Sequence, residues 1–136
     1  MFVNTPPMPG PIGMSEVRGP EAGDPQFVTV AKETDVLEGS MIAVAVSGSP
    51  ILISKIGGRI YAVDAVCSHM YGFLPRGKLE GRVVTCPVHG ARYDITSGEV
   101  VKNVGALMKR ASRREASRLQ TYEVQLASGE VRIKTQ

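Results

Sequence analysis

The sequence predicts an all-β protein built from antiparallel sheets, a sandwich or small barrel of about nine strands. Three observations indicate this class: short runs rich in β-branched residues, glycine-bearing turns between them, and only one stretch of helical character. The turn signal Ser-Gly-Glu occurs at 97–99 and at 128–130, each time between two apolar runs. With 136 residues the chain suits one domain with a single modest core.

The expected strands follow one another from residue 26 onward, and each is a short run rich in Val, Ile, Thr or Tyr. The first is QFVTVAK, and the next two are MIAVAVSG and PILISKI. Gly57 and Gly58 then form a two-residue hairpin signal, because glycine adopts the positive φ that primed turns require. The complete set of expected strands is 26–32, 41–48, 50–56, 59–66, 82–86, 91–95, 99–103, 121–126 and 130–136.

Two segments lie outside this pattern. Residues 1–26 contain most of the prolines and few large apolar side chains, so we expect a flexible tail, with the domain at 27–136 and Met14 as an alternative start. Residues 104–119, VGALMKRASRREASRL, are helix-like, with Arg110, Arg114 and Arg118 on one helical face. Like charges on one face repel, so this segment needs either a partner or an extended conformation.

The charge of the chain, +3 in total, is unevenly distributed. Residues 109–118 hold four arginines and one lysine against Glu115 alone. Such a cluster suits nucleic acid, an anionic membrane or an acidic protein surface, or it is simply a solvated segment. The sequence has neither a long apolar run nor a secretory signal at its start, so the cytoplasm is the expected location.

All the cysteines and histidines fall in two pairs, Cys67-Ser68-His69 and Cys86-Pro87-Val88-His89. Each pair lies where an expected strand gives way to a loop, so two loops offer one thiolate and one imidazole each. Such a set suits tetrahedral zinc, although zinc fingers place two cysteines together and two histidines together. In a [2Fe–2S] cluster, mixed pairs allow both cysteines to bind one iron and both histidines to bind the other.

The segments CSH and CPVHGARYD resemble the two ligand motifs of Rieske proteins, and the resemblance extends over about 27–136. GKLEGRVVTCP, TSGEV and YEVQLASGEVRIK are similar to the flanking turns and closing hairpin of Rieske-type ferredoxins. The resemblance implies Rieske-like antiparallel sheets with a small cluster-binding subdomain at about 65–95. It also implies one [2Fe–2S] cluster, with Cys67 and Cys86 on the inner ferric iron and His69 and His89 on the outer iron.

Neighbouring residues suggest how the loops and the cluster are adjusted. Pro87 fixes its φ and stiffens the second loop, and Gly90 permits a backbone conformation that a Cβ hinders. Met70 either shields the cluster from water or only packs between the loops, and the same alternatives hold for Phe73, Leu74 and Pro75.

The redox potential is expected toward the low end of the family span of roughly −150 to +300 mV. High-potential Rieske proteins have an extra cysteine in each loop and a serine two places after the second histidine. This chain has Val88 in place of the second extra cysteine and Ala91 in place of the serine. Tyr93, however, stands where low-potential ferredoxins usually have Phe, and its hydroxyl either donates to the sulfur of Cys67 or points to solvent.

The resemblance implies a one-electron carrier, not an enzyme in itself, that passes electrons from a flavin-dependent reductase to a terminal oxygenase of the ring-hydroxylating type. The basic insertion at about 105–118 departs from the family pattern, and its 109–118 part is a candidate docking segment. Nucleic-acid and membrane partners are not expected. The alternatives are a small Rieske subunit of a larger oxidoreductase and a structural zinc module. Nitrite-reductase small subunits share the fold but generally lack the four ligands.

Overall fold

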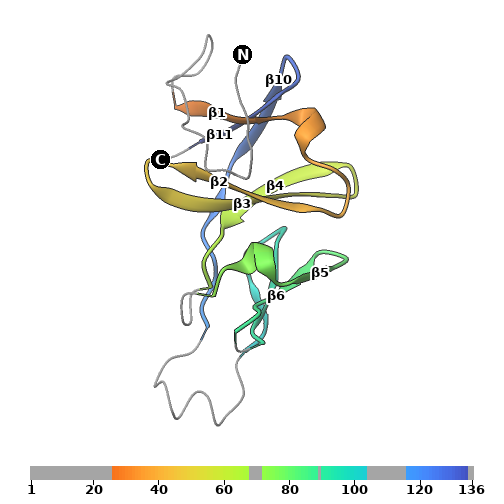
Figure 1. Ribbon diagram of the computed structural model, residues 1–136, viewed down its shortest axis with the longest axis vertical. Helices are drawn as coiled ribbons and strands as arrows, with labels where there is room; N and C mark the ends of the chain where they lie inside the picture. The colour runs from red at the N-terminus through yellow and green to blue at the C-terminus, as the bar shows by residue number, and fades with distance from the viewer. Residues whose placement is uncertain (1–25, 68–71, 89, 104–115, 135–136) are drawn as a thin grey trace.

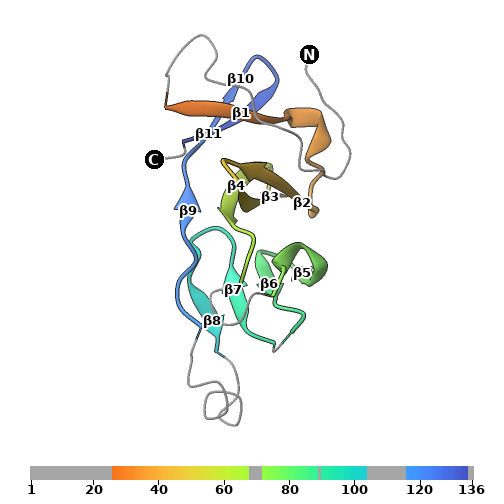
Figure 2. The ribbon, with the colours of Figure 1, turned by 60° about the vertical axis from the view of Figure 1, so that its left-hand side comes forward.

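The computed structural model describes residues 26–67, 72–88, 90–103 and 116–134, and it confirms the all-β class. Eleven strands in these ranges form three antiparallel sheets, which lie one above the other along the long axis of the molecule (Figures 1 and 2). Two short 3-10 helices, η2 (Glu33–Asp35) and η3 (Leu74–Arg76), accompany them. Within the same ranges, no helix is long and apolar enough to cross a membrane.

Each sheet has a simple strand order. The first is β1-β11-β10, the second is β2-β3-β4-β9 and the third is β5-β6-β7-β8. Their bounds are β1 (Phe27–Lys32), β2 (Met41–Val46), β3 (Ser49–Ile56), β4 (Arg59–Asp64), β5 (Lys78–Glu80), β6 (Val83–Thr85), β7 (Arg92–Asp94), β8 (Val100–Lys102), β9 (Thr121–Tyr122), β10 (Val124–Ala127) and β11 (Glu130–Lys134).

The strands differ from the sequence expectation in two places. Strand β5 was not expected, because three residues between Gly77 and Gly81 are too short for a recognisable alternation. The expected strand 121–126 is divided at Glu123, because β9 pairs with β4 whereas β10 pairs with β11. One continuous run of sequence therefore serves two different sheets.

The glycine hairpin between β3 and β4 is confirmed. Gly57 and Gly58 have φ values of 61° and 82°, and Ile56 pairs directly with Arg59. The carboxylate of Glu38 accepts hydrogen bonds from both glycine amides, at 2.6 and 2.9 Å. These two bonds lower the pKa of Glu38, since they stabilise its charged form.

Two cores lie on opposite faces of the second sheet. On β3, Ile51 and Ile53 belong to the core shared with the first sheet, whereas Leu52 belongs to the core shared with the third sheet. Because side chains alternate along a strand, β3 is buried on both faces, which explains its unbroken run of apolar residues. The core shared with the third sheet also contains Val63, Ala65, Cys67, Leu74, Val84, Cys86, Ala91, Tyr93, Ile95, Ala116 and Leu119.

Hydrogen bonds of Asp64 join the two chain segments that link the second and third sheets. Its side chain accepts from the hydroxyl of Tyr122 at 2.7 Å and from the backbone N–H of Gln120 at 3.3 Å. Its own N–H donates to the carbonyl of Gln120 at 3.0 Å. Burial and the bond to Asp64 raise the pKa of Tyr122 above its usual value.

The expected helix-like range, 104–119, is only partly described. Residues 104–115 lie outside the described residues, and 116–119 are irregular rather than helical. Asn103 is bonded to Ala116 on both sides of its amide: Nδ2 donates to the Ala116 carbonyl at 3.1 Å, and Oδ1 accepts from the Ala116 N–H at 3.0 Å. These two hydrogen bonds hold Asn103 and Ala116 next to each other.

Candidate metal centre

Both cysteines lie in the core between the second and third sheets. Cys67 follows β4 after a short bend, and Cys86 directly follows β6. They are 4% and 3% exposed, and neither forms a disulfide. Two buried thiols from different loops are thus available as ligands.

Backbone hydrogen bonds close the base of each cysteine loop. The N–H of Cys67 donates to the carbonyl of Gly72, and the N–H of Cys86 donates to the carbonyl of Ala91, both at 2.7 Å. Gly90 donates to the carbonyl of Cys86 at 3.1 Å and has a φ of 79°, the left-handed region that glycine favours. These bonds hold the two cysteine backbones in fixed positions.

The histidine half of the predicted ligand set is not described. His69, Met70 and His89 lie outside the described residues, whereas Pro87 is placed and exposed. For this reason, no group of three or more metal-ligating side chains is found within the described ranges. The four-ligand set therefore stays a prediction, of which the structure places the two cysteines.

Gly72 lies against the side chains of both cysteines. A Cβ at this position would overlap the Sγ of Cys86 and would lie 3.5 Å from the Cβ of Cys67 and 3.1 Å from a methyl carbon of Val88. Gly72 was not among the predicted site residues. The sequence shows a glycine in the first cysteine loop, which could have pointed to this position. Its close approach to Cys86, however, depends on how the second cysteine loop folds.

Tyr93 forms the hydrogen bond that was one of the two alternatives. Its hydroxyl lies 3.0 Å from the Sγ of Cys67, and the residue is fully buried in the middle of β7. A metal-bound cysteine is a thiolate and has no proton, so in that state the hydroxyl is the donor. Ala91, also fully buried, supplies no hydroxyl.

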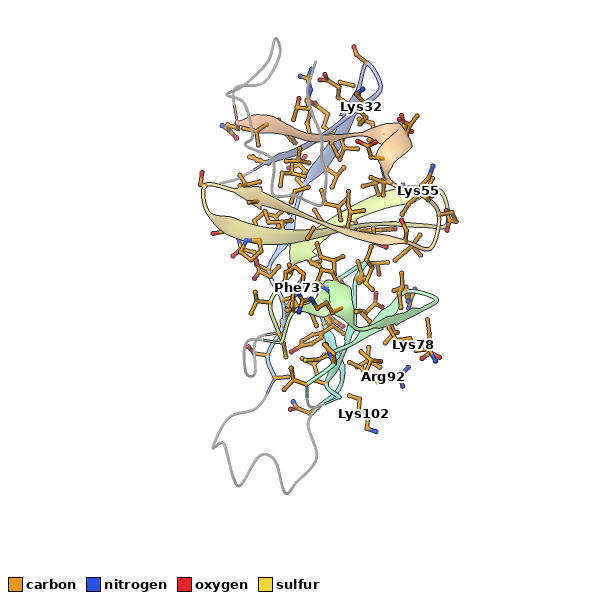
Figure 3. The ribbon with its side chains drawn as sticks, in the orientation of Figure 1. Lys32, Lys55, Phe73, Lys78, Arg92 and Lys102 are labelled. Carbon is orange, nitrogen blue, oxygen red and sulfur yellow. The ribbon has the colours of Figure 1, made fainter. Side chains whose placement is uncertain are left out.

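The apolar segment after the first loop packs beneath the cysteines. Leu74 is fully buried in the core that contains Cys67 and Cys86, and its N–H donates to the carbonyl of Ala65 at 2.8 Å. Phe73 is partly buried, forms a bridge with Val66 and carries Arg76 over its ring at 5.8 Å. The position of Phe73 near the join between the sheets is visible in Figure 3. Leu74 therefore packs in the core with both cysteines, and the choice between the two expected roles stays a prediction.

Replacing Tyr93 with Phe is expected to lower the midpoint potential by about 20–40 mV. The hydroxyl stabilises the added negative charge of the reduced state. A hydrogen bond from a neutral donor contributes about 1 kcal/mol, and the midpoint potential changes only by the difference between its contributions to the reduced and oxidised states. Protein-film voltammetry measures the shift. Tyr122→Phe is the matched control, because it removes a hydroxyl bonded to Asp64 and is expected to leave the midpoint unchanged. Equal midpoints for Tyr93→Phe and the unmodified protein would remove Tyr93 from the account of the potential.

The arrangement of these residues fits an iron–sulfur cluster. Two buried thiols that form no disulfide lie next to Gly72, and the sulfur of Cys67 is hydrogen-bonded to the hydroxyl of Tyr93. Such donors to cysteine sulfur are a known means of adjusting cluster potentials.

Comparisons with known proteins agree with this chemistry. The family model of the Rieske [2Fe-2S] domain matches residues 26–123. The ferredoxin component of the naphthalene 1,2-dioxygenase system of Pseudomonas putida is 37% identical over 76 residues, which cover 56% of this chain and 73% of that protein. Sulredoxin of Sulfurisphaera tokodaii is 30% identical over 91 residues, which cover 67% and 82%.

Solved structures have the same fold. The ferredoxin of carbazole 1,9a-dioxygenase from Nocardioides aromaticivorans aligns with a TM-score of 0.68 at 21% identity, covering 81% of this chain and 98% of that chain. A complex of oxygenase and ferredoxin in carbazole 1,9a-dioxygenase gives a TM-score of 0.66 at 25% identity, covering 79% and 92%. Because the family model matches residues 26–123, most of its length, the chain belongs to the Rieske [2Fe–2S] domain family.

Proposed function

We propose that this protein is a one-electron carrier whose single Rieske-type [2Fe–2S] cluster is held by Cys67, His69, Cys86 and His89. The observation that carries the proposal is the pair of buried cysteines on separate loops, which form no disulfide and lie beside Gly72, where a Cβ would overlap the Sγ of Cys86. When bound, the cluster supplies reversible one-electron chemistry.

The described side chains serve such a carrier in distinct ways. The core around Cys67 and Cys86 excludes water from their sulfurs, and the Tyr93 hydroxyl would donate a hydrogen bond to the thiolate of Cys67. On the outer side of the second loop, Pro87 and Val88 are exposed, Val88 by 50%. The cluster would thus be buried on its cysteine side, and the exposure of Pro87 and Val88 suits electron exchange at the surface beside the second loop.

The partners we propose are a flavin-dependent reductase as donor and a terminal oxygenase of the ring-hydroxylating type as acceptor, in the cytoplasm. Similarity to ferredoxin components of dioxygenase systems supports this assignment. One chain of the oxygenase–ferredoxin complex of carbazole 1,9a-dioxygenase has the same fold as this protein, which supports the assignment further. The proposal includes docking through 109–118, most of which lies outside the described residues.

We propose the following domain limits from the sequence composition and the resemblance to Rieske proteins. Residues 1–26 form the tail, 27–136 the Rieske domain, about 65–95 the cluster-binding subdomain and about 105–118 the basic insertion. The first described strand begins at Phe27, in agreement with the proposed limit.

Absorption and EPR spectra before and after dithionite reduction test the proposal directly. We expect a red-brown protein whose reduced form has the low average g value of a histidine-ligated cluster. Cys67→Ser and Cys86→Ser should lose the cluster, as should His69→Ala and His89→Ala, whereas Val88→Ser, an exposed neighbour of the second pair, should retain it. A colourless protein containing zinc in equal amount after anaerobic preparation would contradict the assignment.

A further inference from the structure

The outer face of the third sheet carries a row of positive side chains. Lys78 pairs with Thr85, Thr85 with Arg92, and Arg92 with Lys102. Directly opposed residues on antiparallel strands point to the same face, so Lys78, Thr85 and Arg92 share one face. Lys102 pairs with Arg92 at a register shift and is exposed, and it continues the row across the strands. Figure 3 shows Lys78, Arg92 and Lys102 following one another along one side of the molecule.

This row, which we call the cationic row (Lys78, Arg92 and Lys102), lies beside the second cysteine loop. Thr85, within the row, immediately precedes Cys86. Arg92 immediately follows Ala91, whose carbonyl accepts the hydrogen bond from the Cys86 N–H. The row therefore marks the edge of the sheet at which the loop containing Cys86 begins and ends.

Nearby carboxylates neutralise the row only in part. Glu80 lies 3.7 Å from Lys78 and 3.6 Å from Arg92, and these exposed pairs are worth little. In the described part of the chain, Lys102 has no ion pair, and the Nε of Arg92 is buried without a hydrogen-bond acceptor. Among the described residues, Glu80 is thus the one carboxylate that pairs with any of the three positive charges of the row.

Positive charge is concentrated in this region of the molecule rather than spread over it. The described residues of 72–88, 90–103 and 116–120 include six cations and three carboxylates. Those of 26–67 and 121–134 include five cations and six carboxylates. Lys32 and Lys55 belong to this second group, and Figure 3 shows them toward the opposite end of the molecule from Lys102.

We propose that the cationic row is a docking surface for an acidic patch on an electron-transfer partner protein. The inference rests on the proposed function, and it concerns described strand residues rather than the 109–118 segment. Redox interfaces are small, and complementary charge mainly speeds the encounter and orients the partners. A cationic row at the edge of the Cys86 loop would orient an acidic partner toward the cluster.

Stopped-flow oxidation of the dithionite-reduced protein tests the local charge. Ferricyanide is the anionic probe and hexaammineruthenium(III) the cationic probe; each accepts one electron from the protein and becomes ferrocyanide or hexaammineruthenium(II). The test variant is Lys78→Gln with Lys102→Gln. The control is Lys32→Gln with Lys55→Gln, which changes the net charge by the same amount in the region of balanced charge.

At low ionic strength, we expect the test variant to react about fivefold more slowly with ferricyanide than the control does, and faster with the ruthenium complex. Both differences should disappear in high salt. Poly-L-glutamate, a polyanionic competitor, should slow ferricyanide oxidation of the unmodified and control proteins more than that of the test variant.

Equal rates for the test and control variants would overturn the inference, because only net charge would then matter. The absorption and EPR spectra test the proposed function separately. Normal spectra together with equal rates would contradict only the docking role of the cationic row. Absence of a cluster signal in the unmodified protein contradicts the proposed function, and the inference falls with it. Since both lysines of the test variant are exposed strand residues, cluster content should equal that of the control.

Discussion

Gly72→Ala protein is expected to contain little or no iron–sulfur cluster. The added methyl group would overlap the Sγ of Cys86, and the sulfur would have to rotate away from its present position. A rotation of this kind costs the fold little but removes a ligand, so the main loss is in cluster binding. Iron and sulfide content per chain, together with visible absorption, measure it.

Gly81→Ala is the control for this substitution. Gly81 has a φ of 64° in the turn between β5 and β6, but a Cβ there meets no atom within 4 Å. Alanine at this position is expected to lower the free energy of unfolding by about 1 kcal/mol through backbone strain, without loss of the cluster. Full cluster content in Gly72→Ala protein would show that the second loop can move aside.

Leu74→Ala is expected to lower the free energy of unfolding by about 2–5 kcal/mol. Leu74 is fully buried in the core that contains both cysteines, so its truncation leaves a cavity beneath them. We also expect the cluster to be lost faster on dilution into chelator. Urea unfolding measures the first effect, and the decay of visible absorption measures the second.

Leu126→Ala provides the comparison, since Leu126 is 46% exposed on β10. It is expected to change stability by less than about 0.5 kcal/mol. If the two leucine variants unfold at the same urea concentration, the packing between the cysteine loops contributes less than its burial indicates.

Local sequence was sufficient for features that depend on neighbours in the chain. The glycine pair at 57–58 forms the expected hairpin because both residues adopt positive φ. The short apolar runs likewise form strands where they were expected. The two cysteines were identified because each belongs to a compact motif in a single loop. The resemblance to a known family was carried by these same short motifs.

Features set by contacts between distant segments were not predictable in the same way. Gly72 is required next to Cys86, which is on another loop, and a sequence does not display that distance. The hydroxyl of Tyr93 had two plausible directions until the packing of β7 placed it against Cys67. The division of 121–126 into β9 and β10 likewise depends on which sheet lies nearby.

The Asn103–Ala116 pair of hydrogen bonds has a consequence for how this domain can diversify. Because one side chain joins the two ends of 104–115, the length of the chain between them has little influence on the scaffold. The entropy of closing a loop rises only slowly with its length. Insertions, deletions and changes of charge there can therefore accumulate while the cysteine loops keep their geometry. Evolution, or a protein engineer, could change partner recognition at this position and retain the same redox centre.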